Sequence, residues 1–128
     1  MILDTSAVIA IIRDELDRPR LVEAIAEADE IGIGTPTMVE ASVVLVRRFG
    51  PVGQHFLVDF LAERSVVDIP FEHHHWRLAA QASIRYGKGR HPAALNFGDC
   101  MTYATARVAG VPLLFTGEDF AKTDVVAA

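Results

Sequence analysis

Three acidic residues, Asp4, Glu40 and Asp99, stand among apolar or small residues, where an ionised carboxylate is costly without a cationic partner. A fourth acidic position is the neighbouring pair Glu118 and Asp119, which follows an apolar segment near the end of the chain. Carboxylates gathered in one place repel each other, and hard divalent cations such as Mg²⁺ or Mn²⁺ relieve that repulsion. A site built only from carboxylates suits phosphate chemistry, in which the ion activates water and neutralises charge on the phosphoryl group.

Each of these acids also has a purely structural interpretation as a helix cap. Asp4 directly precedes a predicted helix, and a carboxylate there can accept hydrogen bonds from the first helical N–H groups. Asp99 lies three residues after Asn96, which is the spacing of a capping box, and Glu40 has the same spacing from a threonine. At Glu40 this interpretation is weaker, because Pro36 favours the first helical position and would place the cap at the preceding residue, Thr35.

Short strands alternate with longer helices along the chain. The predicted strands are Ile2–Leu3, Ile31–Gly34, Ser65–Ile69 and Val111–Phe115. The predicted helices are Ala7–Ile12, Arg18–Ala28, Thr35–Arg48, Val52–Arg64, Glu72–Tyr86 and Phe97–Ala109. The strands are wholly apolar rather than alternating, which is typical of a parallel sheet with helices on both faces. With no linker or repeat, we predict one α/β domain over residues 1–128, with more helix than strand.

The predicted topology brings the acids together. In open α/β sheets, ligands bind beyond the carboxyl ends of the strands, where loops and the first turns of helices meet. Asp4 and the pair Glu118 and Asp119 directly follow strands, while Glu40 and Asp99 lie in the first turns of helices that start at the same edge. The sequence therefore predicts one acidic site at that edge.

Four segments of the chain, taken together and in this order, resemble the VapC-type toxins of bacterial toxin–antitoxin pairs, which are PIN-domain ribonucleases. The segments are ILDTSAVIAII, TPTMVEASVVL, HPAALNFGDCMTYATA and PLLFTGEDFAKTDV. The resemblance implies a three-layer α/β/α sandwich with a short, mainly parallel sheet. It also implies RNA cleavage that depends on Mg²⁺ or Mn²⁺ and leaves a 5′-phosphate and a 3′-hydroxyl, with inhibition by a cognate VapB-type antitoxin.

By the same match, Asp4, Glu40 and Asp99 take the three central acidic positions of the family. For the fourth position, Glu118 and Asp119 both fit the family pattern, and the sequence leaves the two open. We expect Asp4 and Asp99 to hold the metal, directly or through water. Glu40 and the fourth acid would complete the pocket and orient or deprotonate the attacking water.

Three polar residues are candidates for supporting roles near these acids. Ser6 and Thr116 could form hydrogen bonds to the carboxylates or to the substrate phosphate. Asn96 could do the same, although capping of the following helix is an equally good interpretation.

Two clusters of basic or imidazole side chains also need an interpretation. Arg90 belongs to a polar, flexible stretch, Gly87–Pro92, where contact with an RNA backbone and an ordinary solvated loop are equally good interpretations. The run His73–His75 favours a solvated helix face, because consecutive helical residues point about 100° apart and cannot share one ion.

Composition excludes several classes of protein. The chain has 12 Lys and Arg against 17 Asp and Glu, a formal charge of −5, which excludes a protein that holds nucleic acid by bulk charge. Four site acids account for about four of those negative charges, and a bound divalent ion would cancel roughly two of them. The remaining surface can therefore still carry a local basic rim that contacts RNA.

The single cysteine, Cys100, excludes an internal disulfide and fits the cytoplasm. The apolar N-terminal stretch contains Asp4, so we expect neither a targeting segment nor a membrane span.

These observations predict a divalent-metal-dependent endoribonuclease that acts as the toxin of a toxin–antitoxin pair. The expected partners are an RNA substrate, a VapB-type antitoxin and a second copy of the chain, in a homodimer and a toxin–antitoxin hetero-oligomer. Two alternatives stay open: a PIN-like nuclease of RNA processing without a toxic role, and a catalytically inactive binding module whose acids only cap helices.

Overall fold

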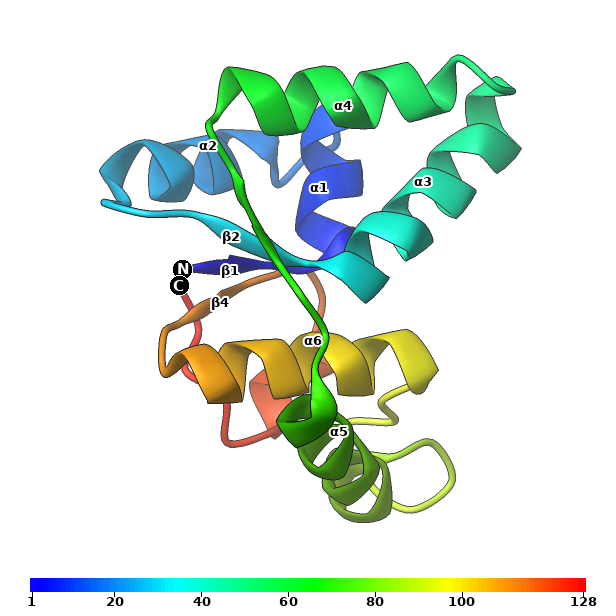
Figure 1. Cartoon of the computed structure of the whole chain (residues 1–128), viewed down its shortest axis with the longest axis vertical. Helices are drawn as coiled ribbons and strands as arrows, with labels where there is room; N and C mark the ends of the chain where they lie inside the picture. The colour runs from blue at the N-terminus through cyan, green and yellow to red at the C-terminus, as the bar shows by residue number, and fades with distance from the viewer.

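The computed structural model describes all residues, Met1–Ala128, and shows strands and helices in the predicted order. Figure 1 shows their arrangement. The strands are β1 (Ile2–Leu3), β2 (Gly32–Gly34), β3 (Val67–Ile69) and β4 (Leu113–Leu114). The α-helices are α1 (Thr5–Ile12), α2 (Arg18–Glu27), α3 (Thr35–Phe49), α4 (Gly53–Glu63), α5 (His73–Tyr86) and α6 (Phe97–Ala109), and a 3₁₀ turn, η1 (Phe120–Lys122), follows β4.

The four strands form one parallel sheet in the order β3-β2-β1-β4. The central strand β1 pairs with β2 on one side and β4 on the other, and all three are buried along their length. Burial on both faces explains why these strands are continuously apolar. At the edge, β3 is mostly exposed and carries Asp68, a charge that protects an open sheet edge from pairing with other chains.

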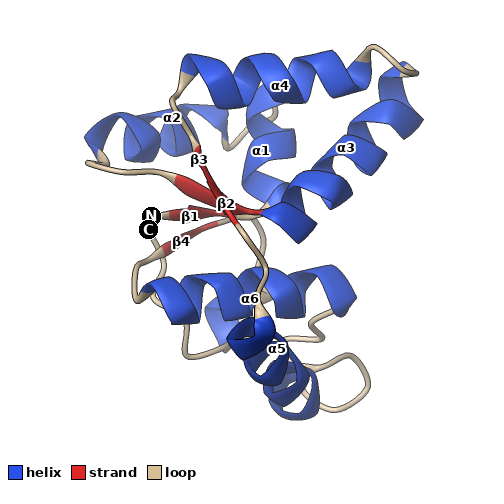
Figure 2. Cartoon of the chain, in the orientation of Figure 1, coloured by secondary structure: helices blue, strands red, loops and turns tan.

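Helices cover both faces of the sheet, as Figure 2 shows, with α1 to α4 on one face and α5 and α6 on the other. Successive strand residues point to opposite faces. Leu3 and Leu114 therefore pack into the core beneath α1 to α4, while Ile2 and Leu113 pack into the core beneath α5 and α6. The predicted three-layer α/β/α architecture is confirmed. None of the helices combines the length and apolar character needed to cross a bilayer.

The element boundaries differ from prediction where local geometry decides them. The first helix begins at Thr5 rather than Ala7, because Asp4 already caps it. The predicted cap of α3 at Thr35 is wrong: Gly34 is the N-cap residue, without a side-chain cap bond, and Pro36 occupies the second helical position. The third strand starts two residues later than predicted, because Ser65 has a φ of 51°, the left-handed conformation of a turn.

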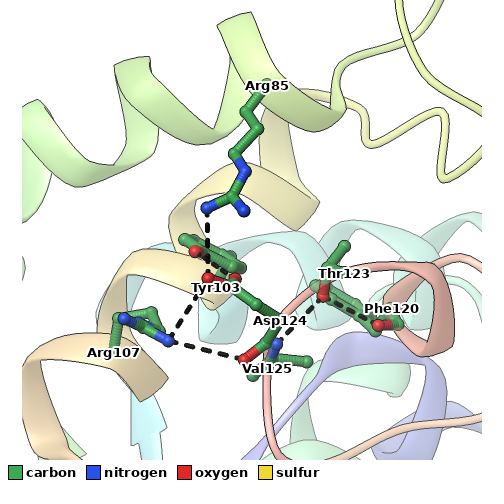
Figure 3. A network of polar contacts seen from close by, with 7 residues as sticks. All are labelled: Arg85, Tyr103, Arg107, Phe120, Thr123, Asp124 and Val125. Carbon is green, nitrogen blue, oxygen red and sulfur yellow. Dashed lines mark hydrogen bonds and ion pairs between the residues drawn. The ribbon is translucent and has the colours of Figure 1, made fainter.

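The C-terminal segment is held against the body of the protein by a polar network around Asp124, drawn in Figure 3. Asp124 accepts a hydrogen bond of 2.7 Å from the Tyr103 hydroxyl and forms ion pairs with Arg85 and Arg107. The Tyr103 bond is the main cause that lowers the pKa of Asp124, and burial, together with Asp124, raises the pKa of Tyr103 to about 12. Backbone bonds between Leu113 and the last residues complete the attachment.

Replacing Asp124 by Asn is expected to lower the thermal midpoint of unfolding by roughly 2–5 °C at pH 7, since exposed ion pairs contribute little individually. An asparagine still accepts the Tyr103 bond but loses both ion pairs. The folded-state pKa of Asp124 is depressed, so its contribution is present at neutral pH and disappears as the pH falls through that value. Thermal unfolding followed by circular dichroism at pH 7 and pH 3 measures both effects. Asp59→Asn, an exposed acid on α4, is the control, and an equal loss at both pH values would contradict the ion-pair account.

Candidate active site

The acidic residues come from four elements that meet at the carboxyl edge of the sheet, the side on which α3 and α6 begin in Figure 2. Asp4 directly follows β1 and is the N-cap residue of α1. Glu40 lies in the second turn of α3, which begins directly after β2. Asp99 is in the first turn of α6, and Asp119 precedes η1 after β4. The predicted topology therefore delivers these side chains to one edge.

Asp4 is the most deeply placed of these acids, with only 3% of its surface exposed. Its Oδ2 accepts two hydrogen bonds from Ser6, one of 2.9 Å from the backbone N–H and one of 2.6 Å from the hydroxyl. Its Oδ1 is equally buried and has no hydrogen-bond partner. Burial is the main cause that raises the pKa of Asp4, and the charge of Glu40 raises it further. A buried carboxylate oxygen without a partner is unfavourable in the apo protein and available to a cation.

Glu40 does not form the capping box that its spacing from Thr37 allowed. Its Oε2 accepts a 2.6 Å hydrogen bond from the hydroxyl of Thr5 in the first turn of α1. On its other side the carboxylate lies against the backbone of Gly98, where an added Cβ would stand 2.5 Å from Oε1. A side chain at position 98 would therefore occupy the place of the Glu40 carboxylate, and the glycine lets α3 and α6 share that space.

Asp99 does form the predicted capping box with Asn96. Its Oδ2 accepts a 2.8 Å bond from the Asn96 backbone N–H, and Asn96 Oδ1 accepts a 2.9 Å bond from the Asp99 N–H. Burial raises the pKa of Asp99 to about 6, and the charges of Asp4, Glu40 and Asp119 act in the same direction. These three contributions show that the four carboxylates lie within electrostatic reach of one another.

The sequence leaves open whether Glu118 or Asp119 takes the fourth acidic position, and the two residues differ in their electrostatic effect on Asp99. Asp119 is among the charges that raise the pKa of Asp99, and Glu118 is not. Both side chains are exposed, so either is accessible to solvent and substrate. The charge of Asp119 therefore acts on Asp99, and Asp119 is the candidate for the fourth acidic position that is taken up below.

The donor set fits a hard divalent cation held by few protein ligands. No three His, Cys, Asp or Glu side chains of the structure are arranged to enclose an ion by themselves. Mg²⁺ rarely needs such a cage, because it keeps several water molecules and binds proteins through one or two carboxylates. The partnerless Oδ1 of Asp4 and the second carboxylate oxygen of Asp99, which accepts no hydrogen bond, match that requirement.

The predicted supporting residues divide into two groups. Ser6 is central: its hydroxyl donates to Asp4 and accepts a 3.0 Å bond from the backbone N–H of Thr116, which ties the end of β4 to the end of β1. Thr116 contributes through its backbone. Asn96 serves as the cap of α6. Arg90 is exposed and forms no ion pair, and it lines a cavity that also includes Asn96.

The structure bears on both the basic and the imidazole clusters. In the stretch Gly87–Pro92, backbone bonds join Lys88 to Leu95 and both Arg90 and His91 to Gly87, so these residues form hydrogen-bonded turns. The solvated-face prediction for the histidine run is wrong at its last member. His75 is 3% exposed, stacks on Phe71 and accepts a bond from the Glu72 backbone, which completes the cap of α5.

Sequence reasoning missed three residues that contribute to the site. Thr5 holds Glu40, Gly98 makes room for it, and Arg20 donates a 2.9 Å bond to the carbonyl of Phe115 at the end of β4. A glycine one residue before a candidate acid in a predicted helix was the one available signal, because glycine there is unfavourable unless another group approaches closely. The partners of Thr5 and Arg20 are distant in sequence, and no local pattern marks them.

Known proteins are similar to this chain over almost its whole length. The family model described as the PIN domain matches residues 1–126. A Mycobacterium tuberculosis protein named Ribonuclease VapC30 is 46% identical over 127 residues, which cover 98% of this chain and 95% of that protein. A Mycolicibacterium smegmatis protein named Ribonuclease VapC is 43% identical over 127 residues, covering 99% and 98%.

Solved structures share the fold at low sequence identity. The crystal structure of Mycobacterium tuberculosis VapC20, titled a sarcin-ricin loop cleaving toxin, matches with a TM-score of 0.81 and 15% identity over 99% of this chain and 97% of that one. A toxin–antitoxin complex from Klebsiella pneumoniae matches with a TM-score of 0.72 and 17% identity, over 99% and 95%. At these identities the likeness shows the fold.

Proposed function

Since this chain belongs to the PIN domain family, and within it to the VapC proteins, we propose that it is a divalent-metal-dependent endoribonuclease and the toxin of a VapBC-type toxin–antitoxin system. The names of its relatives support ribonuclease activity. The dependence on Mg²⁺ or Mn²⁺ is supported by the chemistry of the donor set.

One observation carries the proposal: Asp4 keeps a buried carboxylate oxygen without a hydrogen-bond partner, at the edge of the sheet where other acids gather. Burial raises the pKa of Asp99 to about 6, and the charges of Asp4, Glu40 and Asp119 raise it in the same direction. Such mutual repulsion is unfavourable for folding and is typical of a site that binds a cation. The capping interpretation explains one oxygen each of Asp4 and Asp99 but leaves the other oxygen of each without a partner. It explains nothing about Glu40, which caps no helix.

In the proposed mechanism, a bound Mg²⁺ or Mn²⁺ would activate water and neutralise charge on the scissile phosphate. Asp4 and Asp99 would hold the ion, and Ser6 fixes the orientation of the Asp4 carboxylate through its two hydrogen bonds. Glu40, held by Thr5, and Asp119 orient the attacking water and accept its proton. Attack of this water on phosphorus would break the P–O3′ bond, and the departing 3′-oxygen would take up a proton, which leaves a 5′-phosphate and a 3′-hydroxyl.

The proposed partners follow from the same family membership. We infer an RNA substrate, a VapB-type antitoxin and a homodimer that assembles with the antitoxin, in the cytoplasm. The similar structure from Klebsiella pneumoniae, titled a toxin–antitoxin complex, supports the antitoxin, as does a similar structure titled VapBC2 from Rickettsia felis.

The test of the proposed function is incubation of the purified protein with a single-stranded RNA in Mg²⁺, in Mn²⁺ and in EDTA, followed by analysis of the RNA ends. We expect cleavage with either ion, none in EDTA, and 5′-phosphate ends. Cleavage that persists in EDTA would contradict the metal dependence. An absence of cleavage under all conditions would favour the catalytically inactive binding module, and cleavage without growth arrest on expression would favour an RNA-processing nuclease.

The fourth acid is tested by comparing Asp119→Asn with Glu118→Gln. We expect Asp119→Asn to lower the initial rate of RNA cleavage at least about tenfold, as is common for groups next to a metal site, and Glu118→Gln to stay within about twofold of the wild-type rate. Both residues are exposed, so neither change should affect folding. The reverse ranking would assign the fourth position to Glu118.

A further inference from the structure

A cavity of about 620 Å³ lies between α5, α6 and the loop that joins them. Figure 1 shows these two helices and their loop on the face of the sheet opposite α1 to α4. The cavity is within the size range of small-ligand sites. Its walls include three aromatic side chains, Phe71, Trp76 and Phe97, and two cations, Lys88 and Arg90.

The aromatic side chains of this cavity are unusually open to solvent. Phe97 is 83% exposed and Trp76 is 51% exposed, although both are large apolar groups. Exposed aromatic faces next to a cleft are suited to stacking with another flat ring. Nucleobases stack on such side chains in proteins that bind single-stranded nucleic acid, and the interaction tolerates any base because every base has a π-face.

The charge of the cavity is opposite to that of the whole protein. No Asp or Glu lines it, and neither Lys88 nor Arg90 forms an ion pair, whereas nearby Arg85 and Arg107 are bound to Asp124. Of the two cavities of comparable size elsewhere, one is lined by the acids Glu27, Asp29 and Glu30, and the other has two acids and two arginines in its walls, so neither has an excess of positive charge. In a chain of net charge −5, this is the cavity that complements a polyanion.

The cavity and the acidic cluster share the start of α6. Asn96 and Phe97 line the cavity, and the Asn96 backbone is bonded to the carboxylate of Asp99. Asp99 itself does not line the cavity, because residues two apart on a helix point to nearly opposite sides. An RNA chain that enters the cavity would therefore pass around the start of α6 to reach the acidic cluster.

We propose that this cavity receives one unstacked base of a single-stranded RNA substrate, whose chain passes around the start of α6 to the acidic cluster. Phe97 and Trp76 stack on the base, and Lys88 and Arg90 contact the flanking phosphates. This inference rests on the proposed ribonuclease function and adds the element that places the substrate. The competing occupant is a second copy of the chain, which would cover the same aromatic side chains.

Trp76 is the only tryptophan of the chain, so its fluorescence reports directly on the cavity. The probe is a mixed-sequence single-stranded RNA oligonucleotide added to the Asp99→Asn variant, which should bind RNA without cleaving it. We expect saturable quenching by this oligonucleotide and at least fivefold weaker quenching by an abasic sugar-phosphate chain of the same length. Equal quenching by both chains, or none by either, overturns base stacking in the cavity.

Cleavage kinetics of single substitutions distinguish a role of the cavity in RNA binding from a role in the cleavage step. Phe97→Ala is expected to raise KM about tenfold, within the range for loss of one stacked base, and to leave kcat within about twofold. The matched control is Leu16→Ala, since Leu16 is 97% exposed and lines none of these cavities. Lys88→Ala should weaken RNA binding and reduce its dependence on salt, in contrast to Arg47→Ala on α3.

Each outcome has a defined meaning. Wild-type cleavage with an unchanged KM in Phe97→Ala overturns the cavity assignment and leaves the proposed function intact. A change from dimer to monomer in light scattering of Phe97→Ala, with KM unchanged, makes the cavity wall a contact between two copies and also overturns it. Failure of the wild-type protein to cleave RNA removes the proposed function and the cavity assignment together.

Discussion

An Asp99→Asn variant is expected to lose RNA cleavage by a factor of about a thousand or more and yet to unfold at a higher temperature than the wild-type protein in EDTA. Activity falls because the amide cannot replace a carboxylate as a metal ligand. Stability rises because the substitution removes the charge that burial and the carboxylates of Asp4, Glu40 and Asp119 make unfavourable. An asparagine oxygen still accepts the Asn96 N–H bond, so the cap of α6 remains.

The pH dependence of this effect follows from the direction of the shift. The pKa of Asp99 is about 6 in the folded protein against 3.8 ordinarily, so the folded state binds its proton more tightly than the unfolded state does. The wild-type protein therefore loses stability as the pH rises from about 4 to 6, and the loss is complete above 6. After allowance for solvent screening, we expect Asp99→Asn to be more stable by about 1–2 kcal/mol at pH 7.5, or roughly 5 °C.

The measurement is thermal unfolding of both proteins in EDTA and in Mg²⁺ at pH 4.5 and pH 7.5, together with single-turnover RNA cleavage. Mg²⁺ should stabilise the wild-type protein at pH 7.5 and have little effect on the variant. Asp59→Asn, which removes an exposed acid of α4, serves as the control for net charge. A variant that cleaves RNA normally, or that is less stable than the wild type in EDTA at pH 7.5, would contradict the metal-site interpretation and favour capping.

Gly98→Ala is expected to reduce RNA cleavage about a hundredfold without loss of stability. An added Cβ would stand 2.5 to 2.8 Å from the carboxylate atoms of Glu40, so that side chain must move. Its end is flexible, which makes the movement cheap for folding, and alanine is more favourable than glycine inside a helix by about 0.5–1 kcal/mol. Displacement of a positioned catalytic group by about 1 Å can cost on the order of 10² in rate.

A double-mutant cycle with Glu40→Gln tests this cause. If Gly98→Ala acts by displacing Glu40, the two changes together should reduce cleavage little more than Glu40→Gln alone. Fully additive losses would mean that the glycine acts by another route. The thermal midpoint of Gly98→Ala checks the folding half of the prediction, and a fall of several degrees would show that the backbone of α6 has to shift.

The sequence predicted the parts of this fold that depend on local rules. Apolar runs such as Ile2–Leu3 marked the buried strands, and the Asn96 to Asp99 spacing marked the start of α6. The place of the acids followed from topology alone, since Asp4 and Asp119 come after strands that had to be parallel. Those inferences succeed because they need only the order of elements and the handedness of their connections.

What the sequence could not predict depends on contacts between distant residues. The Thr5 to Glu40 bond joins two helices, and the burial of His75 depends on its stack with Phe71. Whether Glu118 or Asp119 faces the cluster depends on a turn after β4 that both residues share. Such features arise from packing, which hydrophobic periodicity does not describe.

The bonds of Ser6 have a consequence for how the protein would exchange protons with solvent. The single proton of its hydroxyl is donated to Asp4 Oδ2, and its lone pair accepts the Thr116 N–H. With Oδ2 accepting two bonds, Oδ1 is the oxygen of Asp4 on which a proton would be held, and it is also the oxygen available to a cation. Because burial raises the pKa of Asp4, a proton and a divalent cation would compete for that oxygen, and ion uptake would be coupled to acid release.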